Sequence, residues 1–187
     1  MAYAVSPTGA DHCEAAHDPI FEMPGKWLQS VACLGILAPV DSLDLGPRKV
    51  RLFIYLQQIF NLYNSVGMCN FVGIPFGPLP LSKLVDGINA ATGWETSLWE
   101  LLKVGERAGT MARVFNTREG LSANDDTLPE RFFSPLEGGP LQGVRIDKDQ
   151  FRQALKDYYQ MAGWDPDTGI PTKAKLEELD LGEICRT

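Results

Sequence analysis

The chain has 187 residues, with 17 Lys and Arg against 24 Asp and Glu, and a formal net charge of −7. That length suits one globular domain, or one and part of another, and its core needs no disulfide or metal to fold. The acidic balance argues against nucleic-acid binding, because phosphate contacts rely on clustered Lys and Arg. The longest apolar stretches are about half of the roughly 20 residues that a membrane helix needs. We therefore expect no membrane span.

The first residues contain neither a basic region nor a long apolar core, so no signal peptide is predicted and the expected compartment is the cytoplasm. The four cysteines form no CxxC pair, which excludes a zinc or redox site readable from spacing alone. In a reducing compartment Cys13, Cys33 and Cys185 are expected to be free, buried or incidental thiols. The only histidines, His12 and His17, lie in an irregular stretch, and any Cys-His or Ser-His chemistry would have to use one of them.

Residues 1–47 are irregular and rich in Pro, Gly and Asp. A long helix is predicted over Arg48–Val66, with apolar side chains around most of its circumference, which is typical of a buried helix. Phe71–Leu81 cannot continue it, because its three prolines remove backbone donors and clash with the preceding turn.

Four later helices are predicted from a polar residue whose side-chain oxygen can cap the first turn. They are Lys83–Ala91 after Ser82, a helix from the Ser97–Glu100 capping box to about Phe115, a helix from Asp147 to Gly163, and a last helix after Thr172. The sequence therefore predicts an all-α, multi-helix domain with long irregular connections near 67–81 and 116–146.

The connection at 116–146 carries weaker signals. Thr127 and Glu130 predict a second capping box and a short helix, and Gly143–Ile146 predicts a short strand. Asp125 and Asp126 are interpreted as carboxylates that complement the N-terminus of that short helix.

Motifs for dinucleotide binding, phosphate loops, zinc-protease helices and hydrolase nucleophiles are absent. Cys69 differs from the other cysteines because it follows the long helix, two residues after Gly67. A glycine lets backbone approach a ligand closely, so Cys69 is placed where a metal or cluster can bind. One thiolate cannot hold such a group alone, and a buried thiol remains the alternative.

Several segments resemble a known family in their order along the chain. They are Gly9–His12, Asn116–Gly120, Asp125–Phe132, Tyr158-Tyr159, Gly163–Asp165, and Gly169–Thr172 followed by Lys175-Leu176. Together they resemble the tungsten-containing aldehyde ferredoxin oxidoreductase family over nearly the whole chain.

The resemblance implies a larger enzyme, about three times this length, that oxidises aldehydes to carboxylic acids and passes the electrons to ferredoxin. In the family, a β-rich domain binds a bis-pterin tungsten or molybdenum cofactor, and two mostly helical domains follow. A 4Fe–4S cluster is held by three closely spaced cysteines of the middle domain and a fourth of the last. Residues 1–47 are expected to end the middle domain, and 48–187 to form the helical C-terminal domain.

The segment from Asn64 to Cys69 is similar to the family motif Asp-x-x-Gly-Leu-Cys, which contacts a pterin and ends in the fourth cysteine. The resemblance thus implies that Cys69 is a metal ligand and that Asn64, Gly67 and Met68 bind the cofactor. Two positions depart from the motif, Asn64 for Asp and Met68 for Leu. Asn loses the charge and one acceptor oxygen, so we expect a pterin contact that is weaker or differently oriented.

The chain lacks the three-cysteine run and the pterin-binding domain, so by itself it is expected to bind neither cofactor and to be inactive. Three hypotheses stay open: a truncated piece of the enzyme, a separate docking subunit of a split enzyme, or a helical interaction module without redox chemistry. In the first two, the partners are the remaining domains and ferredoxin. Apolar surface is expected at Phe71–Leu81 and Arg48–Val66, and a homodimer is one way to cover it.

Overall fold

The computed structural model describes the backbone of residues 1–186 and the side chains of residues 1–184. Its α-helices are α1 (Ala2–Val5), α2 (Lys26–Ser30), α3 (Pro47–Ser65), α4 (Leu81–Thr92), α5 (Leu98–Arg118), α6 (Lys148–Ala162) and α7 (Lys173–Glu178). Short 3-10 turns occupy Asp18–Phe21, Ala32–Leu34, Glu130–Phe133 and Gly182–Arg186. The described residues contain isolated bridges but no strand, which confirms the all-α class.

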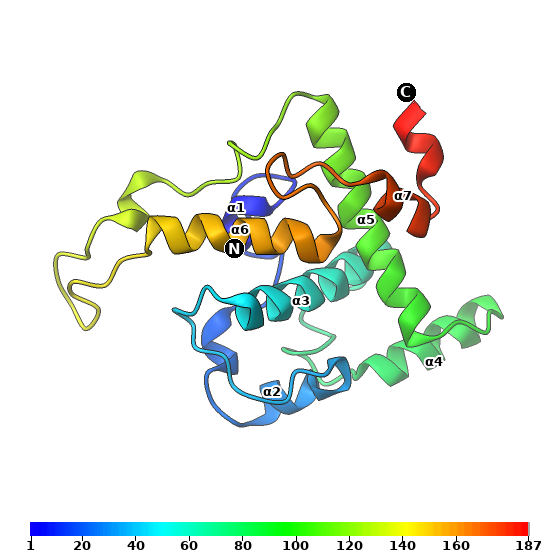
Figure 1. Ribbon diagram of the computed structural model, residues 1–187. Coiled ribbons are helices and arrows are strands. Elements are labelled where there is room, and N and C mark those ends of the chain that lie inside the picture. The colour runs from blue at the N-terminus through cyan, green and yellow to red at the C-terminus, as the bar shows by residue number, and fades with distance from the viewer. Residues whose placement is uncertain (187) are drawn as a thin grey trace.

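Helix α3 forms the centre of the molecule, with α5 and α6 packed against it (Figure 1). Its residues Val50, Ile59, Leu62 and Tyr63 are fully buried. Pro47 begins the helix, where its missing N–H would have no intrahelical partner anyway. The predicted buried helix is therefore confirmed, and its apolar faces are covered within the chain. Of the apolar surface expected on Arg48–Val66, the exposed part lies at its end, where Val66 is 42% exposed.

Helices α3 and α5 approach closely at two glycines, one turn apart on α5. A Cβ atom on Gly105 would lie 1.9 Å from the backbone oxygen of Gln58, and one on Gly109 would lie 2.8 Å from Nδ2 of Asn61. Neither distance is compatible with a side chain at its present position. The two glycines thus set how close the axes of α3 and α5 can come.

Replacing Gly105 with Ala should lower the free energy of unfolding by about 3 kcal/mol or more, because α5 must move away from α3. Gly87→Ala is the matched control, since Gly87 lies within α4 and a Cβ there meets no atom within 4 Å. That change should raise the free energy of unfolding by about 0.5–1 kcal/mol through lower unfolded-state entropy. Urea denaturation measures both, and equal effects of the two substitutions would contradict this packing.

Of the caps predicted for the four later helices, three are confirmed. Ser97 and Glu100 form the reciprocal capping box of α5, Asp147 accepts backbone N–H groups at the start of α6, and Thr172 does so at α7. The prediction for Ser82 is wrong, because α4 begins at Leu81, two residues before the predicted start at Lys83. There the Pro80 carbonyl accepts the first backbone hydrogen bonds of the helix.

The predictions for 127–146 fail where side chains find other partners. Glu130 pairs with Lys148 at 2.6 Å instead of capping, and the turn at Glu130–Phe133 has no side-chain cap. Gly143 takes a positive φ, and Gly143 and Val144 bond back to Leu136 in a local turn rather than a strand. This segment projects from the helical body (Figure 1) and contributes few residues to the core.

Residues 1–47 pack onto the helical part of the chain. Phe21, Val31 and Ile36 join the same buried cluster as the side chains of α3. The division into 1–47 and 48–187 remains a prediction. Across the described residues, none of the helices combines the length and the apolar character that crossing a membrane requires.

Candidate functional site

The segment around Cys69 begins with a capping motif at the end of α3. Gly67 has φ +70, Met68 N–H donates to the Tyr63 carbonyl at 2.8 Å, and Gly67 N–H donates to the Asn64 carbonyl at 3.2 Å. This pair of bonds is a Schellman motif, which needs a left-handed residue after the helix. No atom lies within 4 Å of the position a Gly67 Cβ would take. The left-handed backbone conformation therefore favours glycine at this position, and the space beside its Cα atom is open.

Cys69 lies two residues beyond this turn, with a free and exposed thiol. The buried-thiol alternative is therefore wrong. Next to it, the Asn70 side-chain oxygen is buried without a hydrogen-bond partner. Asn64 is also exposed, and Met68 is half-buried. The structure brings these motif residues to one end of α3, with the thiol directed to the outside of the chain.

The segment that follows is held against α3 by Tyr63. The Tyr63 hydroxyl donates to the Ile74 carbonyl at 3.1 Å, and Gly73 approaches the Tyr63 ring so closely that a Cβ would lie 2.4 Å from it. Phe71 and Val72 nevertheless stay 75% and 45% exposed. The apolar surface predicted for Phe71–Leu81 is therefore present, directly beside Cys69.

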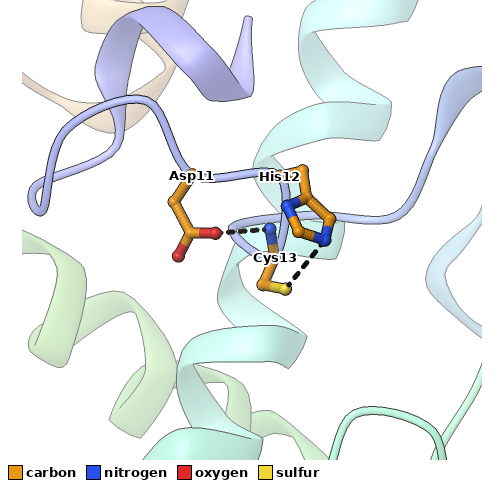
Figure 2. A group of neighbouring side chains, drawn as sticks. All are labelled: Asp11, His12 and Cys13. Carbon is orange, nitrogen blue, oxygen red and sulfur yellow. Dashed lines mark hydrogen bonds between the residues drawn. The ribbon is translucent and has the colours of Figure 1, made fainter.

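Cys69 belongs to no group of three or more metal-ligating side chains among residues 1–184. Among the side chains of residues 1–184, the group that could hold a metal ion is formed by Asp11, His12 and Cys13 (Figure 2). Cys33 is free and exposed, and the side chain of Cys185 lies outside the described residues. Cys13 and Cys33 are thus free, as expected, and of the two alternatives, buried or incidental, their exposure leaves the second.

A buried ion pair links α5 to the long connection that follows it. Arg113 Nη1 donates to Asp126 Oδ1 at 3.0 Å, Nη2 lies 2.8 Å from Oδ2 in an ion pair, and both side chains are at least nine-tenths buried. The Tyr159 hydroxyl of α6 donates to the same carboxylate. Burial and this carboxylate both raise the pKa of Tyr159. Asp126 therefore joins two helices, and its interpretation as a helix-terminus charge is wrong.

The same arginine reaches the loop after α6. Its Nε donates to the Gly169 carbonyl at 2.9 Å, and its guanidinium lies 5.6 Å from the ring centroids of both Tyr159 and Trp164. The indole nitrogen of Trp164 is buried without a partner. Four of the segments that carry the family resemblance thus meet at Arg113, a residue outside all of them.

A second buried network connects the N-terminal segment to the helices. Gln57 of α3 donates to Glu14 at 2.7 Å and accepts from the Tyr158 hydroxyl at 2.9 Å. Burial raises the pKa of the Glu14 carboxyl to about 7, against the opposing effect of the Gln57 hydrogen bond. Asn116 of α5 adds a bond to the Pro7 carbonyl. The segment carrying Gly9–His12 is therefore fixed to α3, α5 and α6.

Sequence reasoning missed these networks for a physical reason. Arg113 and Gln57 lie within helices, where a polar residue is usually solvated, and their partners are 13 to 101 positions away. One signal could have indicated buried partners. Both residues lie on the core-facing side of their helices, where the other residues are apolar.

Comparison with known proteins gives the family of the chain. Residues 1–181 match the family model for aldehyde ferredoxin oxidoreductase, domains 2 and 3. The chain belongs to this family. It is 36% identical over 186 residues to the tungsten-containing aldehyde ferredoxin oxidoreductase of Pyrococcus furiosus, covering 98% of the chain and 28% of that relative. The corresponding enzyme of Thermococcus kodakarensis is 35% identical with the same coverage.

A more distant relative is the WOR-like subunit of an aliphatic sulfonate oxidoreductase of P. furiosus. It is 27% identical, and the alignment covers all of this chain and 25% of that subunit. Among solved structures, the active-site complex BamBC of benzoyl coenzyme A reductase has a TM-score of 0.59 and 24% identity, covering 72% of this chain and 19% of that one. It shares the fold. The chain thus spans little more than a quarter of the curated relatives it matches.

Removing the Asp126 carboxylate should be far more harmful than removing its neighbour. Asp126→Ala leaves Arg113 buried without its counter-charge and should lower the free energy of unfolding by about 3–5 kcal/mol. Asp125→Ala is the control and should have a much smaller effect, because Asp125 is exposed and accepts from Ser122 in a local turn. Thermal or urea unfolding of both variants tests this, and a small effect of Asp126→Ala would contradict the network.

Proposed function

We propose that this chain is the C-terminal part of an enzyme that oxidises aldehydes to carboxylic acids with ferredoxin as electron acceptor, and that Cys69 supplies one of four 4Fe–4S ligands. The observation that carries the proposal is the exposed thiol of Cys69 two residues after the left-handed Gly67, in a segment that resembles the family motif. A thiolate presented outward from a helix end can complete a cluster whose other ligands come from another domain.

The residues around Cys69 fit the expected cofactors. The open face at Gly67 leaves room for a pterin, and the unpartnered oxygen of Asn70 can accept a hydrogen bond from an approaching donor. Asn64 offers both an amide donor and an acceptor oxygen. In this proposal Asn64, Gly67 and Met68 line the pterin side of the site. The tungsten or molybdenum cofactor supplies the redox chemistry, while these residues position it.

The remaining domains of the enzyme are the proposed partner for the face around Cys69. Val66, Phe71 and Val72 are 42%, 75% and 45% exposed there, and an apolar patch of this kind marks an interface. The length of the relatives supports the same partner, since this chain corresponds to about a quarter of them. A separately encoded docking subunit would use the same face. A module without redox chemistry would not need the thiol.

In the complete enzyme, Cys69→Ser should abolish electron transfer from aldehyde to ferredoxin and convert the cluster to a three-iron form or remove it. Iron content and the electron paramagnetic resonance of the reduced enzyme report the cluster directly. Cys33→Ser is the matched control, a second exposed thiol outside the motif, and should leave both measurements unchanged. A complete and functional four-iron cluster in the Cys69→Ser enzyme would refute the ligand role.

The 187-residue chain alone should not hold a cluster. Cys69 belongs to no group of three metal-ligating side chains among the described residues, so anaerobic treatment with iron and sulfide should leave no stoichiometric bound iron after desalting. The chain should also fail to oxidise aldehydes. Four iron and four sulfide retained per chain would contradict this account and favour a self-sufficient redox domain.

A further inference from the structure

A second group of ligating side chains lies far along the sequence from Cys69, in the segment that precedes the 3-10 turn at Asp18–Phe21. We propose that Asp11, His12 and Cys13 bind a divalent transition-metal ion of the Zn²⁺ type. One ligand atom from each residue lies within 4.8 Å of the other two, and none of the three side chains is buried (Figure 2). This inference does not depend on the proposed role of Cys69.

The distance between the two softer ligands fits a tetrahedral ion. His12 Nε2 and Cys13 Sγ are 3.5 Å apart. Zinc bonds of about 2.3 Å to sulfur and about 2.0–2.1 Å to nitrogen, at a tetrahedral angle, place the two ligand atoms about 3.5 Å apart. An ion can therefore enter between imidazole and thiolate with little movement of either.

Asp11 supplies the third ligand and also shapes the loop. Its Oδ1 accepts from the Cys13 N–H at 2.8 Å, which folds the three residues into a tight turn and leaves Oδ2 free for a metal. A carboxylate and a thiolate together balance the charge of a divalent ion. Binding displaces the thiol proton to solvent, and a water completes the four-coordinate shell.

Two further groups flank these residues. The His17 ring lies beside the His12 ring, with centroids 5.9 Å apart and a tilt of 32°. On the other side, Glu14 is anchored to α3 through Gln57. One nitrogen, one sulfur and one oxygen ligand favour zinc or cobalt over magnesium or calcium, which prefer oxygen alone.

The test is a titration of the reduced, chelator-treated chain with Zn²⁺ by calorimetry, and with Co²⁺ by absorption. We expect one ion per chain and a thiolate-to-cobalt charge-transfer band in the near ultraviolet. Loss of a hydrogen-bond partner outside the ligand set already weakens metal binding roughly 10–100-fold, so Cys13→Ser and His12→Ala should each weaken it at least as much. Cys13→Ser should also remove the charge-transfer band.

Cys33→Ser serves as the matched control and should leave affinity and spectrum unchanged, because this exposed thiol belongs to no such group. Far-ultraviolet circular dichroism should be the same for all variants, since no substituted side chain is buried. Failure of the chain to bind Zn²⁺, or binding that survives both Cys13→Ser and His12→Ala, would overturn the proposal. Failure of the iron–sulfur role of Cys69 would leave these measurements unaffected.

Discussion

The close contact of α3 with α5 at Gly105 is the constraint on which the rest of the structure depends. Because the Gly105 Cα faces the backbone of Gln58 without a side chain between them, α5 can lie directly on α3. That approach brings Arg113, two turns further along α5, into reach of Asp126 and Gly169. It also leaves α3 buried along most of its length, with exposed residues at both of its ends.

The segments that carry the family resemblance therefore fall into two groups, one buried and one at the surface. Those after α5 and around α6 gather at the buried Arg113–Asp126 pair and stabilise the fold. Burying the two charges of such a pair costs desolvation free energy. Replacing one partner leaves the other as an uncompensated buried charge. The segments at Gly9–His12 and Asn64–Cys69 instead reach the surface with groups that can bind metals. In the two proposals, fold and chemistry are therefore carried by different parts of the same resemblance.

Much of the helical layout followed from local rules. The apolar circumference of Arg48–Val66 predicted burial, and Ser97, Asp147 and Thr172 predicted helix starts because a cap depends on residues within one turn. Where the outcome depended on distant partners, the prediction failed. Glu130 pairs with Lys148 rather than capping, and Asp126 pairs with Arg113 rather than facing a helix end. At the candidate site, the position of Gly67 was readable, but the exposure of Cys69 depends on how residues 70–80 fold back onto Tyr63.

The central claim is that Cys69 completes a cluster held mainly by the rest of the enzyme. The most direct measurement is a crystal structure of the complete enzyme grown without oxygen. We predict that Cys69 Sγ is bonded to one iron of a 4Fe–4S cluster, with three cysteines from outside this chain on the other irons and a pterin beside Gly67. A cluster whose four ligands all come from elsewhere, with Cys69 at the solvent surface, would contradict the account.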